Sequence, residues 1–228
     1  MSLPRVAVVG LGGLGCPAAL ALAQSGRCRL RLIDDDRVDV SNLQRQILYT
    51  DADAGELKVH AASQRLGPLA EPCAERLTPA RAPTLLDGVD LIVEGTDNVP
   101  TKYFLNDFAV QRRTPLVLGG AVRWRGWALA VADGSACMRC LFEAPEEQGE
   151  SCEFAGVVAP VVGAIGGLQA KLALQLLAGR AMGGTLYHLD GLKPRLRRRD
   201  LRRRVDCPAR EPISTLANLQ RTALKEPG

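Results

Sequence analysis

Residues 5–15 read Arg-Val-Ala-Val-Val-Gly-Leu-Gly-Gly-Leu-Gly, an apolar, β-branched run that passes directly into a glycine-rich turn. An Ala/Leu-rich helical pattern follows and stops at Ser25-Gly26. Glycine lets a phosphate approach the backbone, and a helix N-terminus supplies free N–H donors. The order predicts a strand buried on both faces and then a nucleotide-binding turn. The alternative is that the glycines only allow close packing. The candidates are Gly10, Gly12, Gly13 and Gly15.

An acidic step follows the second apolar run. Residues 29–33 form that run, and Asp34, Asp35 and Asp36 come directly after it. Asp34 lies about 20 residues beyond the turn, the usual distance for a carboxylate that binds ribose hydroxyls. Up to this point the pattern fits an NAD-dependent oxidoreductase as well as it fits an enzyme that uses ATP.

The polar segment after the aspartates favours a triphosphate. Residues 41–46 read Ser-Asn-Leu-Gln-Arg-Gln, and Lys58 comes twelve positions later. Asn42 and Gln46 offer amide hydrogen bonds, whereas Arg45 and Lys58 bring cations that suit a triphosphate tail and a leaving pyrophosphate. A dehydrogenase needs no such cations unless it binds a 2′-phosphate on its dinucleotide cofactor. The alternative is a solvated polar loop.

A third apolar run, residues 89–94, ends in Gly-Thr-Asp-Asn at residues 95–98. Ligands of an open parallel sheet bind at the carboxyl ends of its strands, so we expect Asp97 to point into the same crevice as the glycine turn. A carboxylate beside phosphates suits Mg²⁺. The alternative role is a helix N-cap, since residues 102–106 form a helical pattern, and the two roles are compatible.

Taken together, these motifs resemble the ubiquitin-activating-enzyme superfamily, and more closely its ThiF/MoeB/HesA branch. The resemblance extends from Pro4 to about Cys207. It implies an α/β fold with a doubly wound, mostly parallel Rossmann-like sheet and a smaller, mixed or antiparallel C-terminal region. We expect a nucleotide-binding core over residues 1–135. Residues 136–228 would carry the CxxC motif, a crossover loop and the carrier-binding and dimer surfaces within one continuous domain.

The resemblance also implies an adenylyltransferase. Its substrates would be ATP and the C-terminal Gly-Gly carboxylate of a small ubiquitin-like sulfur-carrier protein, in thiamine, molybdopterin or a related sulfur-transfer pathway, with release of pyrophosphate. The glycines and Asp34 would hold the nucleotide. Asn42, Arg45 and Lys58 would contact its phosphates together with Gln46, and Asp97 would hold Mg²⁺. The carrier's own carboxylate attacks, so the protein supplies alignment and charge neutralisation.

Three of the seven cysteines form a candidate zinc site. Cys137 and Cys140 make a CxxC, which is half of a tetrahedral site. The family usually supplies a second CxxC, but here that place reads Cys207-Pro208-Ala209-Arg210, which lacks the fourth thiol. Three thiolates could hold Zn²⁺ with water or another side chain, or the site has been lost. Cys16, Cys28 and Cys73 are interpreted as packing or incidental residues.

Cys152 is a candidate catalytic thiol. It lies in a polar loop before an apolar run, and some relatives use a cysteine at the matching place as a sulfur or acyl acceptor. The alternative is an unreactive loop thiol. The resemblance implies that the acidic loop over residues 143–151 passes over the tail of the carrier, and that the run over residues 156–177 contributes to a homodimer interface.

Composition and charge narrow the partners. Hydrophobic residues make up 46% of the chain and the net charge is +4, with an arginine-rich run over residues 195–204. This run has no interleaved aromatics, so we interpret it as a strand and turn with solvated arginines that attract an acidic carrier. We expect no nucleic-acid or membrane partner. The absence of a signal sequence or transmembrane run predicts a reducing, cytoplasmic location.

The chain enters its first strand at residue 5, without the Arg- and Gln-rich helical segment with which relatives usually begin. In relatives an arginine of that segment reaches the ATP of the other subunit. In this chain, either another arginine takes that role, or the phosphates are bound more weakly, or a partner protein completes the site. The alternative functions are activation of another carboxylate (a peptide or a ubiquitin-like conjugation tag) and a non-catalytic carrier-binding scaffold.

Overall fold

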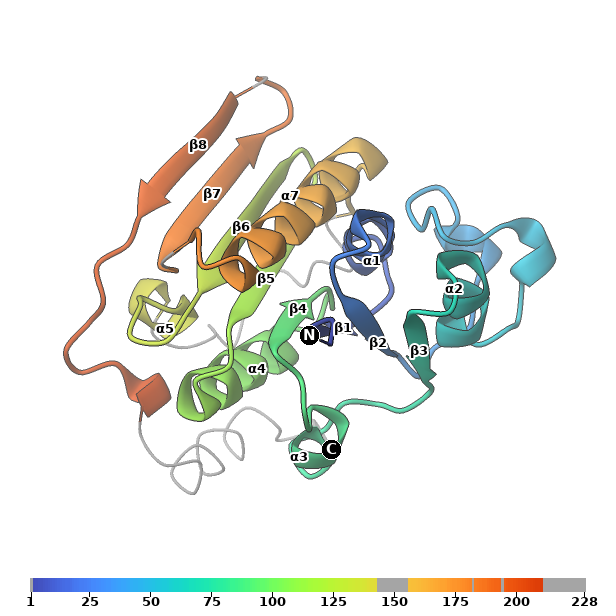
Figure 1. Ribbon diagram of the computed structural model, residues 1–228. Coiled ribbons are helices and arrows are strands. Elements are labelled where there is room, and N and C mark those ends of the chain that lie inside the picture. The colour runs from blue at the N-terminus through green and yellow to red at the C-terminus, as the bar shows by residue number, and fades with distance from the viewer. Residues whose placement is uncertain (1, 143–155, 182, 194, 211–228) are drawn as a thin grey trace, which may run out of the picture.

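A computed structural model describes residues 2–142, 156–181, 183–193 and 195–210. In this part of the chain, one eight-stranded sheet has the order β3-β2-β1-β4-β5-β6-β7-β8 (Figure 1). The strands are β1 Arg5–Val9, β2 Arg29–Ile33, β3 Ala70–Cys73, β4 Leu91–Glu94, β5 Leu116–Val122, β6 Arg125–Val131, β7 Thr185–Asp190 and β8 Arg195–Asp200.

The sheet divides into a parallel and an antiparallel half. β3, β2, β1, β4 and β5 pair in parallel, and β5, β6, β7 and β8 pair as antiparallel neighbours. From β1 the chain adds β2 and β3 on one side, and then β4 and β5 on the other side. The direction in which strands are added therefore reverses at β1. The predicted fold class, a doubly wound sheet with an antiparallel C-terminal region, is therefore confirmed.

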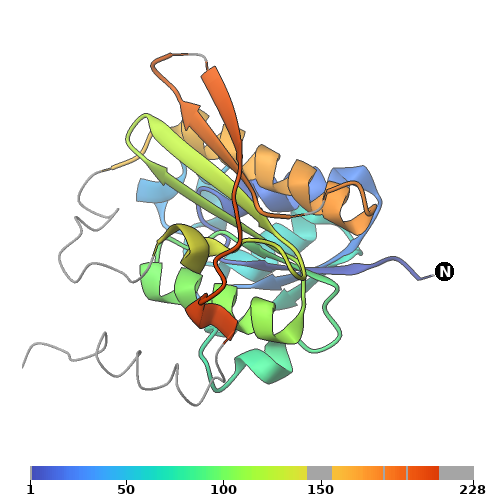
Figure 2. The same cartoon turned by 90° about the vertical axis from the view of Figure 1, so that its left-hand side faces the viewer.

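Helices cover both faces of the sheet (Figure 2). One core lies beneath α1, α2 and α7, and a second core lies beneath α3, α4 and α5. The described helices are α1 Gly15–Ser25, α2 Lys58–Leu66, α3 Ala82–Leu85, α4 Val99–Arg112, α5 Met138–Leu141 and α7 Ala159–Leu177, with short 3₁₀ turns η1 Val40–Asn42, η2 Asp51–Asp53 and η3 Pro208–Arg210.

The long apolar helix α7 packs across the sheet and against α1. Its small residues allow this approach, because a Cβ on Gly166 would lie only 2.5 Å from the carbonyl oxygen of Leu14. By length and composition α7 could cross a membrane, but 56% of its apolar window is buried within the protein. The helix is thus a core element with one partly exposed apolar side.

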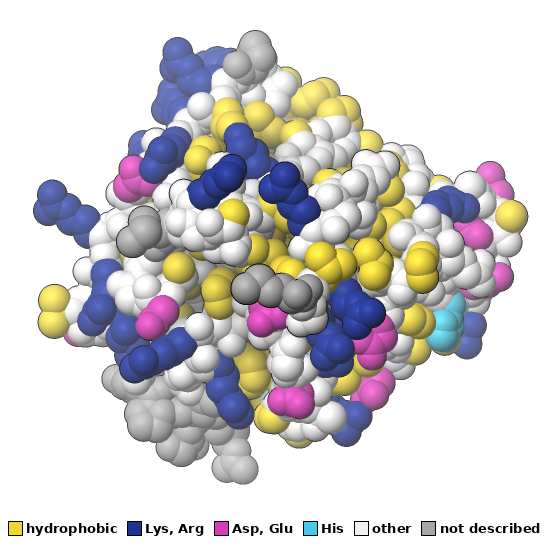
Figure 3. Space-filling model, in the orientation of Figure 1, with side chains coloured by type: hydrophobic (Ala, Val, Ile, Leu, Met, Phe, Trp, Pro, Cys, Tyr) yellow, Lys and Arg dark blue, Asp and Glu magenta, His cyan; other side chains and the backbone are white. Residues whose placement is uncertain are grey.

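The arginine-rich run forms β8, an edge strand whose residues are all exposed. This confirms the interpretation of a strand with solvated arginines. Figure 3 shows basic side chains gathered at the end of the molecule where β7 and β8 lie.

The contrast between β5 and β8 predicts where substitutions are costly. Leu116 of β5 is fully buried, whereas Leu196 of β8 is 52% exposed. Leu116→Ala is expected to lower the free energy of unfolding by about 2–5 kcal/mol, because it removes buried methyl groups and leaves a cavity. Leu196→Ala should change it by less than about 0.5 kcal/mol. Urea unfolding of both variants tests this, and equal losses would contradict the assigned burial.

Candidate active site

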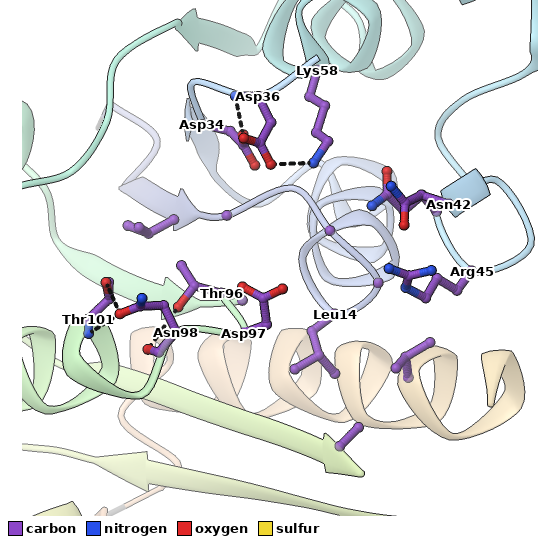
Figure 4. A pocket seen from close by; sticks show the side chains of 18 of the residues that line it. Leu14, Asp34, Asp36, Asn42, Arg45, Lys58, Thr96, Asp97, Asn98 and Thr101 are labelled. Carbon is purple, nitrogen blue, oxygen red and sulfur yellow. Dashed lines mark hydrogen bonds and ion pairs between the residues drawn. The ribbon is translucent and has the colours of Figure 1, made fainter. Parts of the chain in front are cut away.

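A cavity of about 700 Å³ opens at the carboxyl ends of the parallel strands. It is lined by the glycine turn after β1, the aspartates after β2, the segment around η1, the start of α2, the loop between β4 and α4, and the end of β5. Figure 4 shows the side chains from these segments surrounding the glycine turn. The predicted crevice therefore exists, and polar groups from widely separated parts of the sequence meet in it.

The four glycines of the turn divide into two pairs with different roles. Gly10 has φ +84°, and a Cβ there would lie 2.9 Å from the backbone nitrogen of Thr96. A Cβ on Gly15 would overlap the carbonyl oxygen of Gly10, and Gly15 itself does not line the cavity. Gly12 and Gly13 line the cavity, as Gly10 does, but a Cβ on either of them would meet no atom closer than 3.4 Å. The first pair allows close packing, and the second leaves room for a ligand.

Asp34 is held firmly at the edge of the cavity. Its two carboxylate oxygens accept hydrogen bonds from the backbone N–H groups of Leu11, at 2.6 Å, and Asp36, at 2.8 Å. Burial raises the pKa of Asp34 above its usual range, although the Leu11 N–H and the charge of Lys58 partly oppose this shift. The carboxylate thus spans the glycine turn and the end of β2, where a ribose would lie.

Lys58 begins α2 and is almost entirely buried, yet it lines the cavity. Its ammonium donates to the Asp36 carboxylate at 2.7 Å, and the side chain of Asp36 is 67% exposed. An ammonium group has three donors, and Lys58 uses only the one to Asp36 among the residues that the structure describes. The lysine therefore has donors left for an anionic ligand.

Arg45 has no hydrogen-bond or ion-pair partner within the described ranges, and its stem packs beside Gly13. Figure 4 shows its guanidinium directed toward the glycine turn, with Asn42 beside it. Gln46 is 3% exposed, and its side-chain oxygen Oε1 has no hydrogen-bond partner. An unpartnered guanidinium and an orphaned buried amide oxygen in one cavity indicate a site that a polar ligand completes.

In the loop between β4 and α4, the helix-capping role and the metal-binding role considered for Asp97 fall to different residues. Asn98, not Asp97, caps α4, because its side chain accepts from the backbone N–H of Thr101 at 2.8 Å. Asp97 is exposed, lines the cavity and makes no hydrogen bond or ion pair to any described residue. Its carboxylate is accordingly available to a cation at the cavity.

Sequence reasoning missed a buried ion pair beneath this loop. Glu94 of β4 is fully buried, Lys102 of α4 is 6% exposed, and their charged atoms are 2.6 Å apart. The signal was present, since a glutamate ends an otherwise apolar strand and a buried charge requires a partner. Its partner could not be identified, because Lys102 falls in a segment whose helical pattern looks ordinary.

The chemistry of these groups fits a nucleotide triphosphate with a divalent cation. An open glycine turn offers N–H donors at the start of α1 to phosphate. Two cations with free donors suit the remaining phosphate charge, and the exposed Asp97 carboxylate is a hard ligand of the kind that Mg²⁺ takes. A fixed carboxylate, Asp34, completes the set on the ribose side.

The three predicted zinc ligands meet at a separate site under α4 and α5. The sulfur atoms of Cys137, Cys140 and Cys207 all lie within 4.8 Å of one another, and the Cys137 and Cys207 sulfurs are 3.6 Å apart. Burial raises the pKa of Cys137 to about 12. Burial also raises that of Cys140, but a hydrogen bond from the Arg204 N–H and others in the cluster outweigh it and lower the pKa.

This spacing suits three corners of a tetrahedral metal site, since Zn–S bonds of about 2.3 Å place thiolates at such separations. No fourth His, Cys, Asp or Glu ligand joins the cluster among the described residues. Cys152 and the acidic loop over residues 143–151 lie outside the described residues.

Comparison with known proteins gives close matches along the chain. A model of the ThiF family matches residues 2–209. The chain is 42% identical over 231 residues to the adenylyltransferase and sulfurtransferase MOCS3 of Sus scrofa, covering 96% of this chain and 51% of that protein. It is 39% identical to two Escherichia coli proteins, the molybdopterin-synthase adenylyltransferase (89% of this chain, 85% of that protein) and the ThiS adenylyltransferase (90% and 84%).

The fold also matches solved structures. The Escherichia coli MccB structure with ATP superposes with a TM-score of 0.78 at 18% identity, covering 91% of this chain and 67% of that one. At this identity the likeness concerns the fold alone. The chain spans about half the length of MOCS3, the first of the relatives above.

The two pairs of glycines predict opposite outcomes for the same substitution. Gly15→Ala is expected to lower the free energy of unfolding by about 3 kcal/mol or more, because its methyl group overlaps the Gly10 carbonyl. Gly12→Ala should fold normally but bind ATP at least about tenfold more weakly, because its methyl group occupies the cavity. Thermal unfolding and calorimetric titration with ATP measure the two effects. A stable Gly15→Ala protein would refute the packing role.

The cysteine cluster predicts metal content. Protein purified with zinc should contain about one ion per chain, and Cys137→Ser should remove it because two thiolates hold zinc poorly. Cys73→Ser is the matched control, since Cys73 is a half-buried thiol outside the cluster. Elemental analysis decides. Zinc well below one equivalent in the unmodified protein, or retained in Cys137→Ser, would show that the cluster is not a metal site.

Proposed function

We propose, on the premise that this chain belongs to the ThiF family, that it adenylylates the C-terminal carboxylate of a small sulfur-carrier protein. The observation that carries the proposal is the meeting of Arg45, Lys58 and Asp97 around the open side of the glycine turn. Two cations with free donors and one exposed carboxylate suit a triphosphate and its metal ion, and no hydride-transfer chemistry requires them.

The reaction joins a carboxylate oxygen of the carrier to the α-phosphorus of ATP and breaks the bond between the α- and β-phosphates, so pyrophosphate leaves. No protein side chain needs to form a covalent bond in this step. The glycine turn binds the phosphates, Asp34 holds the ribose, and Arg45 and Lys58 neutralise charge that moves onto the leaving pyrophosphate. Lys58 would exchange its bond to Asp36 for one to phosphate.

Magnesium would be held by Asp97, and when bound it screens the phosphate charge that repels an incoming carboxylate. The side chain of Asp97 requires no rearrangement for this role, because no described residue competes for its oxygens. Asn42 and the amide of Gln46 line the same cavity and would orient the phosphates through hydrogen bonds.

The identity of the acceptor rests on the relatives. Two of them are named for the carriers or pathway that they serve, ThiS and molybdopterin synthase, and they match this chain equally well. We therefore propose a small sulfur-carrier protein with a Gly-Gly terminus as the class of substrate. The exposed arginines of β8 would attract an acidic carrier and speed its encounter.

We also propose that Cys137, Cys140 and Cys207 hold zinc as a structural ion that ties α5 to η3.

We further propose that a second copy of the chain covers the partly exposed apolar side of α7 and α1. Figure 3 shows apolar side chains across the face on which these two helices lie. The residues concerned include Leu20, Ala23, Leu168, Leu174 and Leu177.

Exchange of labelled pyrophosphate into ATP tests the activity. The protein should catalyse exchange only when a Gly-Gly-terminated carrier is present. Arg45→Ala should reduce the rate by about 10²–10³-fold, because it removes one fixed charge from the developing pyrophosphate. Arg29→Ala is the matched control, since Arg29 is an exposed arginine at the opposite end of β2, and it should leave the rate unchanged.

Other outcomes of the same assay separate the alternatives. If exchange requires only a short peptide, the substrate is a peptide rather than a carrier protein. ATP binding without exchange, for any carrier, would contradict the enzymatic proposal and favour a carrier-binding scaffold.

A further inference from the structure

Two buried charges lie beneath the cavity without any role in the adenylylation described above. Glu94 ends β4 and is fully buried, and Lys102 lies in the first turns of α4 at 6% exposure. Their ion pair is 2.6 Å long. Burying two charges is expensive unless further hydrogen bonds satisfy them, so their partners indicate what the pair does.

Lys102 cannot serve a phosphate, although it reaches the cavity wall. An ammonium group has three donors. All three are used within the protein, by Glu94 at 2.6 Å, by the carbonyl oxygen of Thr96 at 2.7 Å and by the carbonyl oxygen of Gly119 at 2.6 Å. In this respect Lys102 differs from Lys58, which has donors to spare.

The pair holds Thr96 from both sides. The N–H and hydroxyl of Thr96 donate to Glu94 at 2.7 and 2.6 Å, and its carbonyl accepts from Lys102. Thr96 directly precedes Asp97, whose carboxylate has no partner of its own in the described part of the chain. The position of Asp97 is thus set by its neighbours in the loop, Thr96 before it and the cap residue Asn98 after it.

The same ammonium also contacts β5, the strand next to β4, which forms another part of the cavity wall. Gly119 belongs to β5, and the next two residues, Gly120 and Ala121, line the cavity. Gln169 of α7 reinforces this junction, because its amide donates to the Glu94 carbonyl at 2.7 Å and its side chain fills the space beside Gly119. The ion pair therefore ties the Asp97 loop to the end of β5.

We propose that Glu94 and Lys102 are positioning residues that hold the Asp97 carboxylate at the distance from the β5 wall that a metal-bound triphosphate requires. The inference rests on the proposed use of ATP with Mg²⁺. It predicts that disturbing the pair harms binding of the magnesium complex more than binding of free ATP, because only the former uses Asp97.

The test compares conservative variants by calorimetric titration with ATP, with and without Mg²⁺. Lys102→Arg keeps the charge, but its planar guanidinium cannot point at three acceptors arranged around one nitrogen. It should weaken binding of Mg·ATP by about 10–100-fold, the range typical when residues that support a metal site from outside its ligands are changed, and weaken binding of metal-free ATP much less.

A second buried ion pair provides the control. Arg139 and Asp107 pair at 2.7 Å with side chains 9% and 5% exposed, and neither lines the cavity. Arg139→Lys should lower the melting temperature to a similar degree and leave both ATP affinities unchanged. If Lys102→Arg fails to fold, Glu94→Asp gives the same comparison.

The proposal is overturned if folded Lys102→Arg and Glu94→Asp bind Mg·ATP as tightly as the unmodified protein, or if they weaken both forms of ATP equally. A protein that binds ATP but exchanges no pyrophosphate would contradict the proposed adenylylation alone, because these titrations require no turnover.

Discussion

Three glycine backbones meet where no side chain would fit, and the cavity depends on that contact. A Cβ on Gly95 would lie 2.9 Å from Gly15, and one on Gly10 would lie 2.9 Å from Thr96. The end of β1, the start of α1 and the end of β4 therefore approach one another through backbone atoms alone. This closeness brings the N-terminus of α1, the aspartates after β2 and the Asp97 loop to one place, at the edge where parallel sheets bind ligands.

Three of the four basic residues that line the cavity, Lys102, Lys58 and Arg45, are held in three different ways, and the difference assigns their roles. Lys102 has every donor occupied by the protein and so supports the walls. Lys58 is paired with an exposed carboxylate that solvent can take over. Arg45 meets no described partner and depends on a ligand for one. Charges that the protein holds in place stabilise a polyphosphate without the reorganisation that water would need.

The sequence predicted three of the five strands in the parallel half of the sheet, and most of the cavity, because both rest on local patterns. Apolar runs ending in glycine or aspartate marked β1, β2 and β4 to within two residues, and their carboxyl ends determine where the site lies. The Glu94–Lys102 pair was not predictable, since it depends on how α4 packs over β4. Nor could the division of the glycines be foreseen, because Gly12 and Gly15 look alike until the neighbouring strand is present. The resemblance, rather than periodicity, indicated the three-cysteine cluster.

Both outer strands of the sheet are poor partners for another strand. β3 contains Pro72, which has no N–H to offer, and β8 presents a row of arginines along its length. Open sheet edges are the usual starting points of β-aggregation, and like charges on two such edges repel. Strand-to-strand pairing between molecules is therefore disfavoured at both edges of the described sheet, and β-sheet polymerisation has no open edge from which to start.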